Sequence, residues 1–505
     1  MQSEKKSKEI TLVLIFGLIL IVYLLFPSHN NSGDAWSYAA DARYGLELFS
    51  PHHLLYTVTL YILKIYTGCN PLWLGMCMNS IFAVFSCIVL FCILKIISNN
   101  PLRSLVLTAM VAFSYGFWRF ATENENYIVP IFFSLLGSLY FVKSYTKGIY
   151  SYYYLIISGL FATIGCLYHQ IHIFWFLGLL FGWIWIGGSF SLKRGLVFSA
   201  TFIIAPIAYF LVIAFYMHQS INFYNVIHFV FHDYYIGDAR VHVGFDNFIL
   251  GFISFIRTFF QLHGQIAVMV RNHLYWVIPG IITGMLLLIG IALLIRRLKG
   301  NKSSIKWSNQ DIITKTHILI FVLQLAFAVY SFGNAEFMVM LPALSAIIVV
   351  RTEWIPVKSL AIFVIALFIC NFSYGIYPNY RMHFNANEKV AQYMIDHPKD
   401  RFIVAQPDIV SNQYYYKVGH WPKNLWLSLA TYENRGLMPV LKAQVDSFLT
   451  AGGVIYTDYT AFPRIINRAT MIYNNQDFFR DYNLKDTVVV FETDAGKHCI
   501  IKMSR

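Results

Sequence analysis

The chain has 505 residues, of which 57% are hydrophobic and only 12% are charged. Long apolar runs bounded by short polar loops predict a polytopic α-helical membrane protein, because a soluble core of this size does not need so much apolar surface. Lys and Arg (38) outnumber Asp and Glu (25), but the basic residues stand mostly in short loops between apolar runs, so the excess indicates the positive-inside rule and not a nucleic-acid partner.

The N-terminal apolar run, residues 10–26, follows Lys5, Lys6 and Lys8. We interpret it as an uncleaved first helix with its basic end in the cytoplasm. The apolar runs together predict about eleven transmembrane helices, with the N-terminus inside and the C-terminus outside. Their expected ranges are 10–26, 72–97, 105–118, 127–142, 152–167, 174–190, 197–216, 274–295, 318–332, 337–350 and 359–372. The seven cysteines form no C-x-x-C pair, so neither a disulfide framework nor a zinc site is expected.

Two further apolar segments are not expected to cross. Residues 53–66 are too short to span a bilayer comfortably, so we interpret them as a juxtamembrane helix. Residues 248–270 are interrupted by Arg257, Gln261 and His263. If this segment crossed once, the strongest basic cluster, at 296–315, would face outward. We therefore expect an outer segment that is either interfacial or re-entrant, two alternatives that stay open.

The composition turns soluble after residue 378. Residues 1–378 form the expected transmembrane domain, with outer catalytic loops at about 27–70, 118–127 and 218–272. Residues 379–505 alternate helices and strands, which predicts a soluble, extracytoplasmic α/β domain. The expected helices are 388–396 and 437–449, and the expected strands are 401–405, 425–429, 487–492 and 499–503, with one more that begins at 452–453.

The first outer loop, SGDAWSYAADARYGLELFSPHHLLY at 32–56, brings several ionisable side chains to the membrane edge. Such groups are costly there unless they face water or a functional site. Asp34 is the candidate catalytic residue, because a carboxylate in this position can accept the proton of an attacking hydroxyl. The alternative is that Asp34 caps a helix that starts near Ala35.

The second outer loop contains Glu123 and Glu125, two residues apart. In extended backbone both side chains point the same way, so the pair is a candidate to hold a divalent cation or a substrate hydroxyl. A solvated loop is the alternative. Arg119 is expected either to bind a phosphate or to pair with Glu123.

More polar residues occur in the later outer segments. His169 and His172 have a spacing that suits a metal on a helix, but interfacial histidines more often bond headgroups or backbone. Arg240 is a candidate phosphate ligand in a loop that could order on binding. Glu336 either lines a cavity or caps the helix that starts at residue 337. No G-x-S-x-G, H-E-x-x-H or Walker A motif supports a serine hydrolase, zincin or ATPase.

The order of these motifs is similar to that of a known family. The matching residues are Gly33-Asp34 with Tyr38, Ala39, Ala40 and Gly45; Pro51-His52-His53-Leu54-Leu55-Tyr56; Phe117-Trp118 with Glu123, Glu125 and Tyr127; and Leu167-Tyr168-His169-Gln170. This order resembles the GT-C superfamily of membrane glycosyltransferases, and within it the bacterial protein O-mannosyltransferase-like branch. The motifs span roughly the first 180 residues, and the remainder is similar only in layout.

The resemblance implies an enzyme that uses a polyprenyl-phosphate-linked sugar. By it, Asp34 is the base that deprotonates the acceptor hydroxyl, Glu123 and Glu125 belong to the donor or metal part of the site, and Arg240 holds the lipid phosphate. Ala35 follows Asp34 where the family's mannosyltransferases often have Glu, and His52-His53 replace Pro-Pro, so the donor sugar stays open. The residues expected to bind substrate or donor are Glu123, Glu125, Arg119, His53, His169, His172, Arg240 and Glu336.

We therefore expect a glycosyltransferase in the bacterial inner membrane that acts at its outer face, with a protein, lipid or glycan as acceptor and a divalent cation as the one candidate cofactor. A transporter or flippase for a lipid-linked saccharide is the alternative, and a non-catalytic subunit of polymer assembly is a third reading. Transporters tend to carry polar residues at the midplane between two related halves. Here the polar residues cluster on one side, which favours the enzyme.

Overall fold

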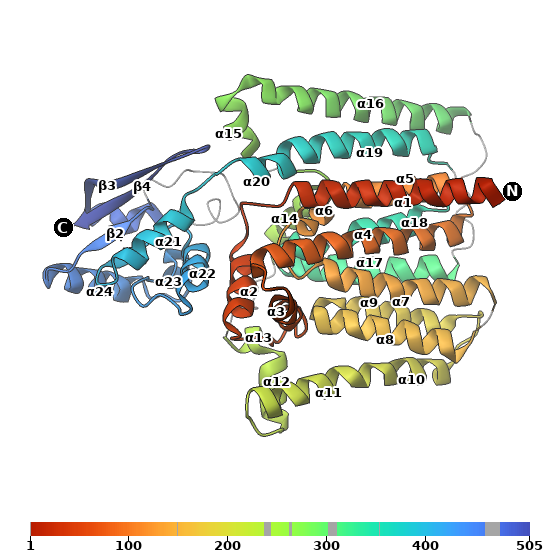
Figure 1. The fold of residues 1–505 in the computed structure, drawn as a ribbon, viewed down its shortest axis with the longest axis horizontal. Coiled ribbons are helices and arrows are strands. Elements are labelled where there is room, and N and C mark those ends of the chain that lie inside the picture. Colours follow the sequence, from red (N-terminus) through yellow and green to blue (C-terminus); the bar gives the residue numbers. More distant parts are fainter. Residues whose placement is uncertain are drawn as a thin grey trace.

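The computed structural model of the chain describes residues 2–148, 150–236, 244–261, 265–300, 311–352, 354–459 and 475–505. Long helices run side by side in a bundle, and a smaller part that contains a sheet stands at one end of it (Figure 1). We call this part, residues 387–505, the α/β region, and the adjoining end of the bundle the α/β end. The N-terminus lies at the opposite end of the bundle (Figure 1).

The described elements before the α/β region are all helical. The first ten are α1 (Gln2–Leu25), α2 (Gly33–Tyr44), α3 (Tyr56–Thr67), α4 (Pro71–Ser98), α5 (Pro101–Ala112), α6 (Tyr115–Ala121), α7 (Ile128–Thr146), α8 (Tyr152–Tyr168), η1 (Gln170–His172) and α9 (Ile173–Trp185). The next are α10 (Leu192–Ala200), η2 (Thr201–Ile203), α11 (Ile204–Leu211), η3 (Val212–Tyr216), α12 (Phe223–Val230), α13 (His232–Ile236), α14 (Phe245–Phe259) and α15 (Gln265–Asn272). The last are η4 (Leu274–Trp276), α16 (Val277–Gly300), α17 (Ile312–Tyr330), η5 (Glu336–Met338), α18 (Leu341–Val349), α19 (Val357–Asn371), η6 (Phe372–Ile376) and α20 (Tyr377–Arg381).

Among the described residues, six helices are long and apolar enough to cross a membrane, and a seventh span results if the bent pair α5–α6 counts as one. The six are Pro71–Ser98, Ile128–Thr146, Leu192–Tyr216, Leu274–Lys299, Ile312–Tyr330 and Val357–Arg381. Shorter apolar helices occupy other ranges that the sequence predicts to span, namely Glu9–Leu25, Tyr152–Tyr168, Gln170–Trp185 and Glu336–Val349. The count of eleven transmembrane helices stays a prediction.

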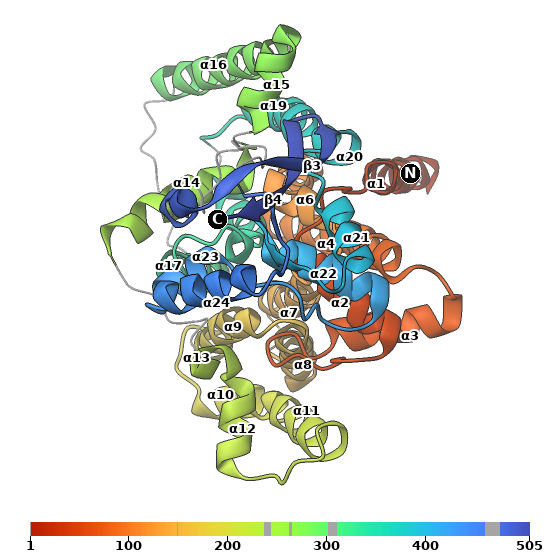
Figure 2. The same ribbon diagram turned by 90° about the vertical axis from the view of Figure 1, so that its left-hand side faces the viewer.

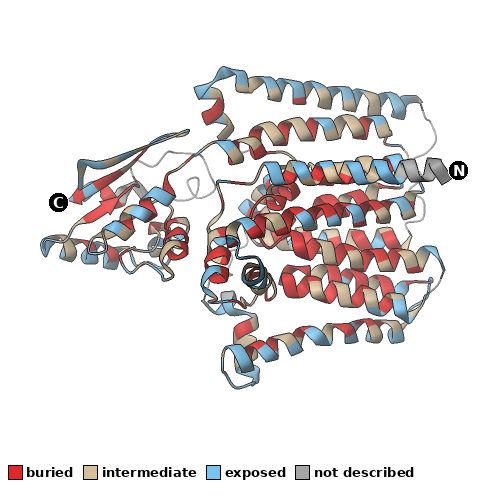
Figure 3. Cartoon of the chain, viewed as in Figure 1, coloured by how far each residue is buried: buried red, intermediate tan, exposed pale blue. Residues whose placement is uncertain are grey.

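Helices at the rim of the bundle carry many exposed residues (Figure 3), and among these are large apolar ones. Val13 of α1 is 71% exposed and Leu288 of α16 is 69% exposed. Apolar surface on this scale is unfavourable in water but matches hydrocarbon, where helices satisfy their own backbone hydrogen bonds. The exposed apolar faces therefore support an integral membrane protein.

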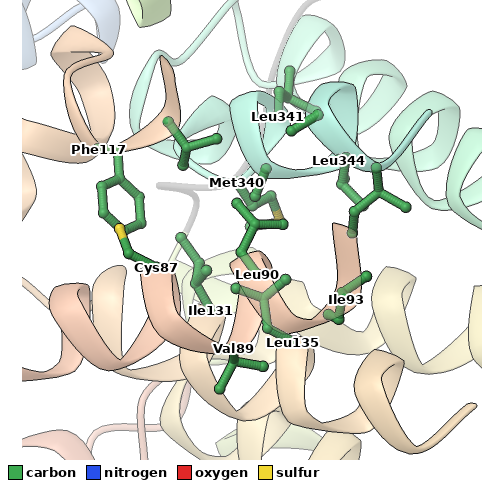
Figure 4. Packing of buried hydrophobic residues seen from close by; sticks show 14 of the residues in the cluster. Cys87, Val89, Leu90, Ile93, Phe117, Ile131, Leu135, Met340, Leu341 and Leu344 are labelled. Carbon is green, nitrogen blue, oxygen red and sulfur yellow. The ribbon is translucent and has the colours of Figure 1, made fainter. Parts of the chain in front are cut away.

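The interior of the bundle is closely packed and apolar (Figure 4). Leu90 of α4, Phe117 of α6, Leu135 of α7 and Leu344 of α18 are each at most 1% exposed and belong to one cluster. Close packing of this kind resists small displacements, so the helix ends that project from the bundle have fixed positions.

The segment 105–118, predicted as one continuous span, is broken. α5 ends at Ala112, α6 begins at Tyr115, and the two are bent by 68°. At the break the Ser114 hydroxyl donates to the Val111 carbonyl at 2.8 Å, a local bond that competes with the helical ladder. The bend directs the end of α6, and the buried loop that follows it at 122–127, toward the polar centre described below.

Within its described residues, the α/β region contains a four-stranded sheet in the order β1-β2-β4-β3. β1 is parallel to β2, whereas β4 is antiparallel to both of its neighbours. The strand predicted at 425–429 is wrong, because Leu425 makes only an isolated bridge to Phe402 and a helix begins at Leu429. The elements are α21 (Asn387–Asp396), β1 (Arg401–Ile403), α22 (Pro407–Val418), α23 (Leu429–Asn434), α24 (Met438–Thr450), β2 (Ile455–Thr457), η7 (Asn475–Asp481), β3 (Asn483–Thr493) and β4 (Gly496–Ser504).

Helix α22, which the sequence did not predict, fastens the α/β region to the bundle. It packs along α2, and both views show the two helices together (Figures 1 and 2). The Tyr415 hydroxyl donates to Asp41 Oδ1 at 2.9 Å, and Asn412 Nδ2 donates to the Gly33 carbonyl at 2.9 Å. Asp41 and Tyr415 are both buried, so this contact excludes water.

The buried Asp41 predicts a pH dependence of stability. Burial and, less strongly, Glu47 raise the pKa of Asp41 to about 7, although bonds from Tyr415 and Ser37 lower it. An unfolded Asp titrates near about 3.9, so the protonated form is favoured by folding and the stability it contributes is lost as the pH rises toward 7. We expect the unfolding temperature of the purified protein to fall between about pH 5 and about pH 8, and Asp41→Asn to flatten that fall.

Asn can still accept the bond from Tyr415, so the variant removes the charge and keeps the contact. Asp486→Asn, a change at an exposed residue of β3, is the matched control and should keep the wild-type slope. An unchanged slope in Asp41→Asn would show that another group carries the dependence.

Candidate active site

Asp34 lies in the first turn of α2, at the α/β end of the bundle. The cap of this helix is Ser32, whose Oγ accepts a hydrogen bond from the Ala35 amide at 3.0 Å. The alternative interpretation of Asp34 as the cap is therefore wrong. Asp34 is an exposed residue.

The electrostatic surroundings of Asp34 suit a base. Although the residue is exposed, the protein around it displaces water, and this desolvation is the main reason that the pKa of Asp34 is raised to about 6. The carboxylates of Glu336, Asp408 and Glu123 raise it further, in that order. A carboxylate with a pKa near 6 is ionised at neutral pH and still accepts a proton more readily than an ordinary Asp.

Ser32 joins the two acidic residues of the second loop to the start of α2. Its amide donates to Glu123 Oε1 at 2.7 Å, and its hydroxyl donates to Glu125 Oε1. Arg119 Nε pairs with Glu123 Oε2 at 2.8 Å. Both glutamates are at most 1% exposed, so the alternative of a solvated loop is wrong, and Arg119 has Glu123 as its partner.

These bonds leave few carboxylate oxygens available as ligands for a metal ion. Both carboxylate oxygens of Glu123 are engaged, and burial, followed by the charge of Asp34, raises the pKa of Glu125 well above its usual range. In the part of the chain that the structure describes, no three His, Cys, Asp or Glu side chains gather as a metal site would need. The residues present do not fit the expected divalent cation, and we derive no step through one.

The loop at 122–127 is held from α4 and α2. Asn79 Nδ2 donates to the carbonyls of Glu123 and Glu125, at 2.7 and 2.6 Å. Asn124 Nδ2 donates to the Ala35 carbonyl at 2.7 Å. Polar side chains of the bundle thus fix the backbone on which the two glutamates stand, an arrangement that the spacing of the acids alone did not reveal.

His53 is a neutral member of this centre. Asn126 Nδ2 donates to the Tyr38 hydroxyl at 3.2 Å, and that hydroxyl also lies 3.2 Å from His53 Nε2, within hydrogen-bond distance. His53 Nδ1 is buried and has no hydrogen-bond partner among the described residues. Burial and the neighbouring His52 lower the pKa of His53 to about 3. The ring therefore carries no charge at neutral pH.

Glu336 reaches the same centre from η5. The Tyr127 hydroxyl donates to Glu336 Oε2 at 3.1 Å, and the Glu336 amide donates to Asn334 Oδ1 at 3.1 Å. The N-cap of η5 is Ala335, which makes no side-chain capping bond, and Glu336 is the acidic residue of the first turn, so both alternatives for Glu336 stay open. Its carboxylate is near enough to Asp34 to raise the pKa of that residue.

The two later histidines differ in position. The ring of His169 lies 5.1 Å from that of Tyr127 and 6.4 Å from that of His53, between ring centroids. His172 is fully buried, with Nδ1 2.7 Å from Ser134 Oγ of α7. The structure therefore brings His169 to the centre, whereas His172 is held within the bundle beside it.

Arg257 of α14 was not among the predicted site residues. α14 crosses α6 closely, since a Cβ on Gly116 would lie 3.3 Å from the Thr258 side chain. Burial and the charge of Arg119 lower the pKa of Arg257, and its Nε is buried without a partner among the described residues. Two neighbouring guanidinium groups favour an anion. The sequence feature that could have identified Arg257 as a site residue is its position within an otherwise apolar segment.

One predicted residue is not tested: Arg240 lies outside the described residues, so its role stays a prediction.

Asp408, in the first turn of α22, was not predicted, and its charge raises the pKa of Asp34 from the α/β region. No pattern in the sequence marked Asp408, because its position depends on the packing of α22 against α2.

Gly75 of α4 offers a test of how rigidly the acidic loop is held. A Cβ at this position would lie 1.7 Å from Asn124 Oδ1, so Gly75→Ala must displace Asn124 and break its bond to Ala35. We expect a loss of about 2–4 kcal/mol in unfolding free energy, measured by denaturant unfolding in detergent, because overpacking adds to a lost buried bond.

Gly284→Ala in α16 is the matched control, since nothing lies within 4 Å of its added Cβ. This variant should be neutral or stabilised by up to about 1 kcal/mol. Equal stability of the two variants would contradict a tightly held loop.

Comparisons with known proteins agree with this geometry at the level of the fold. No protein-family model matches the sequence, and no curated protein sequence matches it either. Among solved structures, the chain is similar to ArnT from Cupriavidus metallidurans bound to undecaprenyl phosphate, with a TM-score of 0.53 and 9% identity over 97% of this chain and 98% of that one. It is also similar to the Archaeoglobus fulgidus oligosaccharyltransferase in complex with Zn and sulfate, with a TM-score of 0.53 and 13% identity over 89% of this chain and 69% of that one.

Identities this low establish a shared fold and nothing finer. The alignment with ArnT extends over nearly the whole of both chains. The helical bundle with a smaller α/β region at one end is therefore a fold that this chain shares with both solved structures.

Proposed function

We propose that this protein is a glycosyltransferase that moves a sugar from a polyprenyl-phosphate-linked donor to an acceptor hydroxyl, with Asp34 as the general base. The observation that carries the proposal is the exposed Asp34, whose pKa is raised to about 6. The glutamates of the same centre accept hydrogen bonds from the protein, Glu123 from the Ser32 amide and Glu336 from the Tyr127 hydroxyl. The fold shared with ArnT, solved with undecaprenyl phosphate, supports a lipid-linked donor.

The reaction follows from these groups. Asp34 takes the proton of the acceptor hydroxyl as its oxygen forms a bond to the anomeric carbon of the sugar. The bond from that carbon to the phosphate oxygen breaks, and the polyprenyl phosphate leaves with the electron pair. A phosphate is a good leaving group, so it needs neutralisation by cations more than protonation.

Arg119 and Arg257 are the proposed ligands of that phosphate, and Arg240 is a third candidate. Arg119 already forms an ion pair with Glu123. Arg257 has an Nε without a partner among the described residues, so it has more hydrogen-bond donors available for a phosphate. His53 is a further candidate donor ligand, because its Nδ1 has no hydrogen-bond partner among the described residues. His169 and Glu336 complete the donor part of the proposed site.

The basic residues support an outer location for the site. Lys95, Lys143, Arg297 and Lys299 stand in the last turns of α4, α7 and α16, which end away from the α/β region (Figure 1). The positive-inside rule assigns that end to the cytoplasm. The polar centre and the α/β region are then extracytoplasmic.

Asp34→Asn tests the base. We expect kcat to fall by about 10²–10⁴-fold while donor binding survives, because general base catalysis is typically worth that much. The rate should be measured with purified protein and a panel of undecaprenyl-phosphate sugars, with the mannosyl donor first. Asp486→Asn, far from the site in β3, is the matched control.

The pH profile is an independent check on the same residue. Because the base must be ionised, wild-type kcat/KM should rise with pH through about 6 and then level. Equal turnover in wild type and Asp34→Asn would remove Asp34 from catalysis, and donor binding without turnover in either would favour the transporter.

Arg257→Ala tests the phosphate site. Loss of a charge-assisted bond should weaken donor binding by about 10–100-fold, and Arg257→Lys should recover only part of it because Lys lacks the two-pronged geometry. Binding can be measured by titration with undecaprenyl phosphate alone. The exposed Arg271 of α15 gives the control Arg271→Ala; an equal effect of both alanine variants would point to general attraction by positive charge.

A further inference from the structure

The α/β region contributes directly to the surroundings of Asp34. The backbone of Asp408 approaches Gly33 so closely that a Cβ on Gly33 would lie 3.8 Å from the Asp408 carbonyl. Asn412, one turn later on α22, donates to the Gly33 carbonyl at 2.9 Å. The first turn of α22 is therefore fixed against the residue that precedes Asp34.

Asp34 and Asp408 differ from the other carboxylates of the centre in their exposure. Both are exposed residues. Glu123 and Glu125 are buried and bonded through Ser32, and Glu336 is half-buried and accepts a bond from Tyr127. The two accessible acids thus come from opposite parts of the chain, one from the bundle and one from the α/β region.

We propose that Asp408 is a specificity-determining residue for the acceptor, and that it accepts a hydrogen bond from a hydroxyl or ammonium group next to the nucleophilic hydroxyl, as on a neutral sugar or an amino sugar. This inference rests on the proposed function, since it assumes that an acceptor hydroxyl approaches Asp34.

The distribution of charge supports this acceptor chemistry. The proposed ligands of the donor phosphate are Arg119 and Arg257, and the charge of Arg119 contributes to lowering the pKa of Arg257. The charge of Asp408 raises the pKa of Asp34, so the two acids together make this part of the site negative. A hydroxyl or ammonium group on the acceptor would donate a hydrogen bond here, whereas a phosphate on the acceptor would meet like charge.

The test compares wild type, Asp408→Asn and Asp408→Glu with the donor of the panel that wild type uses. The acceptor probes are methyl glucoside, methyl glucosaminide and glucose 6-phosphate, and hydrolysis of the donor by water is measured in parallel. Asp396→Asn, an exposed acid on α21, is the matched control. Unfolding temperatures establish that each variant is folded.

We expect wild type to prefer the two uncharged or cationic glycosides over the phosphorylated sugar. Asp408→Asn should lower kcat/KM for those two at least about tenfold, chiefly through the KM of the acceptor, because a bond to a charged group is lost. The KM of the donor and the hydrolysis rate should stay within about twofold of wild type, and Asp408→Glu should recover part of the loss. A larger loss with the glucosaminide would identify ammonium as the recognised group, and an equal loss would identify hydroxyl.

A purely structural role would lower hydrolysis and transfer alike, and that result would overturn the inference, as would kinetics of Asp408→Asn that match the control. Hydrolysis without transfer to any probe would overturn the acceptor class assigned to the site. Sugar release from none of the donors by wild type would instead contradict the proposed function, and so remove the premise on which the inference rests.

Discussion

The arrangement depends on the bonds that Ser32 makes to Glu123 and Glu125. A buried carboxylate without partners is strongly unfavourable, and the backbone and hydroxyl of Ser32 supply partners to both. The same hydroxyl caps α2, so satisfying the two acids also fixes the start of that helix. Asp34 follows two residues later and has no freedom to move away from the acidic loop.

The buried ionisable groups of the centre have defined partners or shifted pKa values. Glu123 is paired with Arg119, burial raises the pKa of Glu125, and burial lowers the pKa of His53 to about 3. The proposed base and the proposed phosphate ligands come from different elements, since Asp34 stands on α2, Arg119 on α6 and Arg257 on α14. This separation suits a displacement in which a proton leaves on one side and a phosphate on the other.

The rest of the fold keeps these groups in position. The apolar cluster around Leu90 and Phe117 holds α4 and α6, whose ends carry the acidic loop. The break between α5 and α6 turns a membrane-length apolar segment into one that delivers Arg119 to the centre. From the other side, α22 is anchored on α2 through Asp41 and Tyr415, which extends the site into the α/β region.

The sequence by itself determined the polytopic helical class and the candidates Asp34, Glu123, Glu125 and Glu336, because apolar run length and ionisable residues at membrane edges are local features. The tertiary structure decided what those residues contact: Ser32 and not Asp34 caps α2, Glu123 pairs with Arg119, and Glu336 accepts a bond from Tyr127. Arg257 and Asp408 join the site only through the crossing of α14 over α6 and the packing of α22 on α2. Such long-range contacts leave no periodic signal, since each depends on segments far apart in the chain.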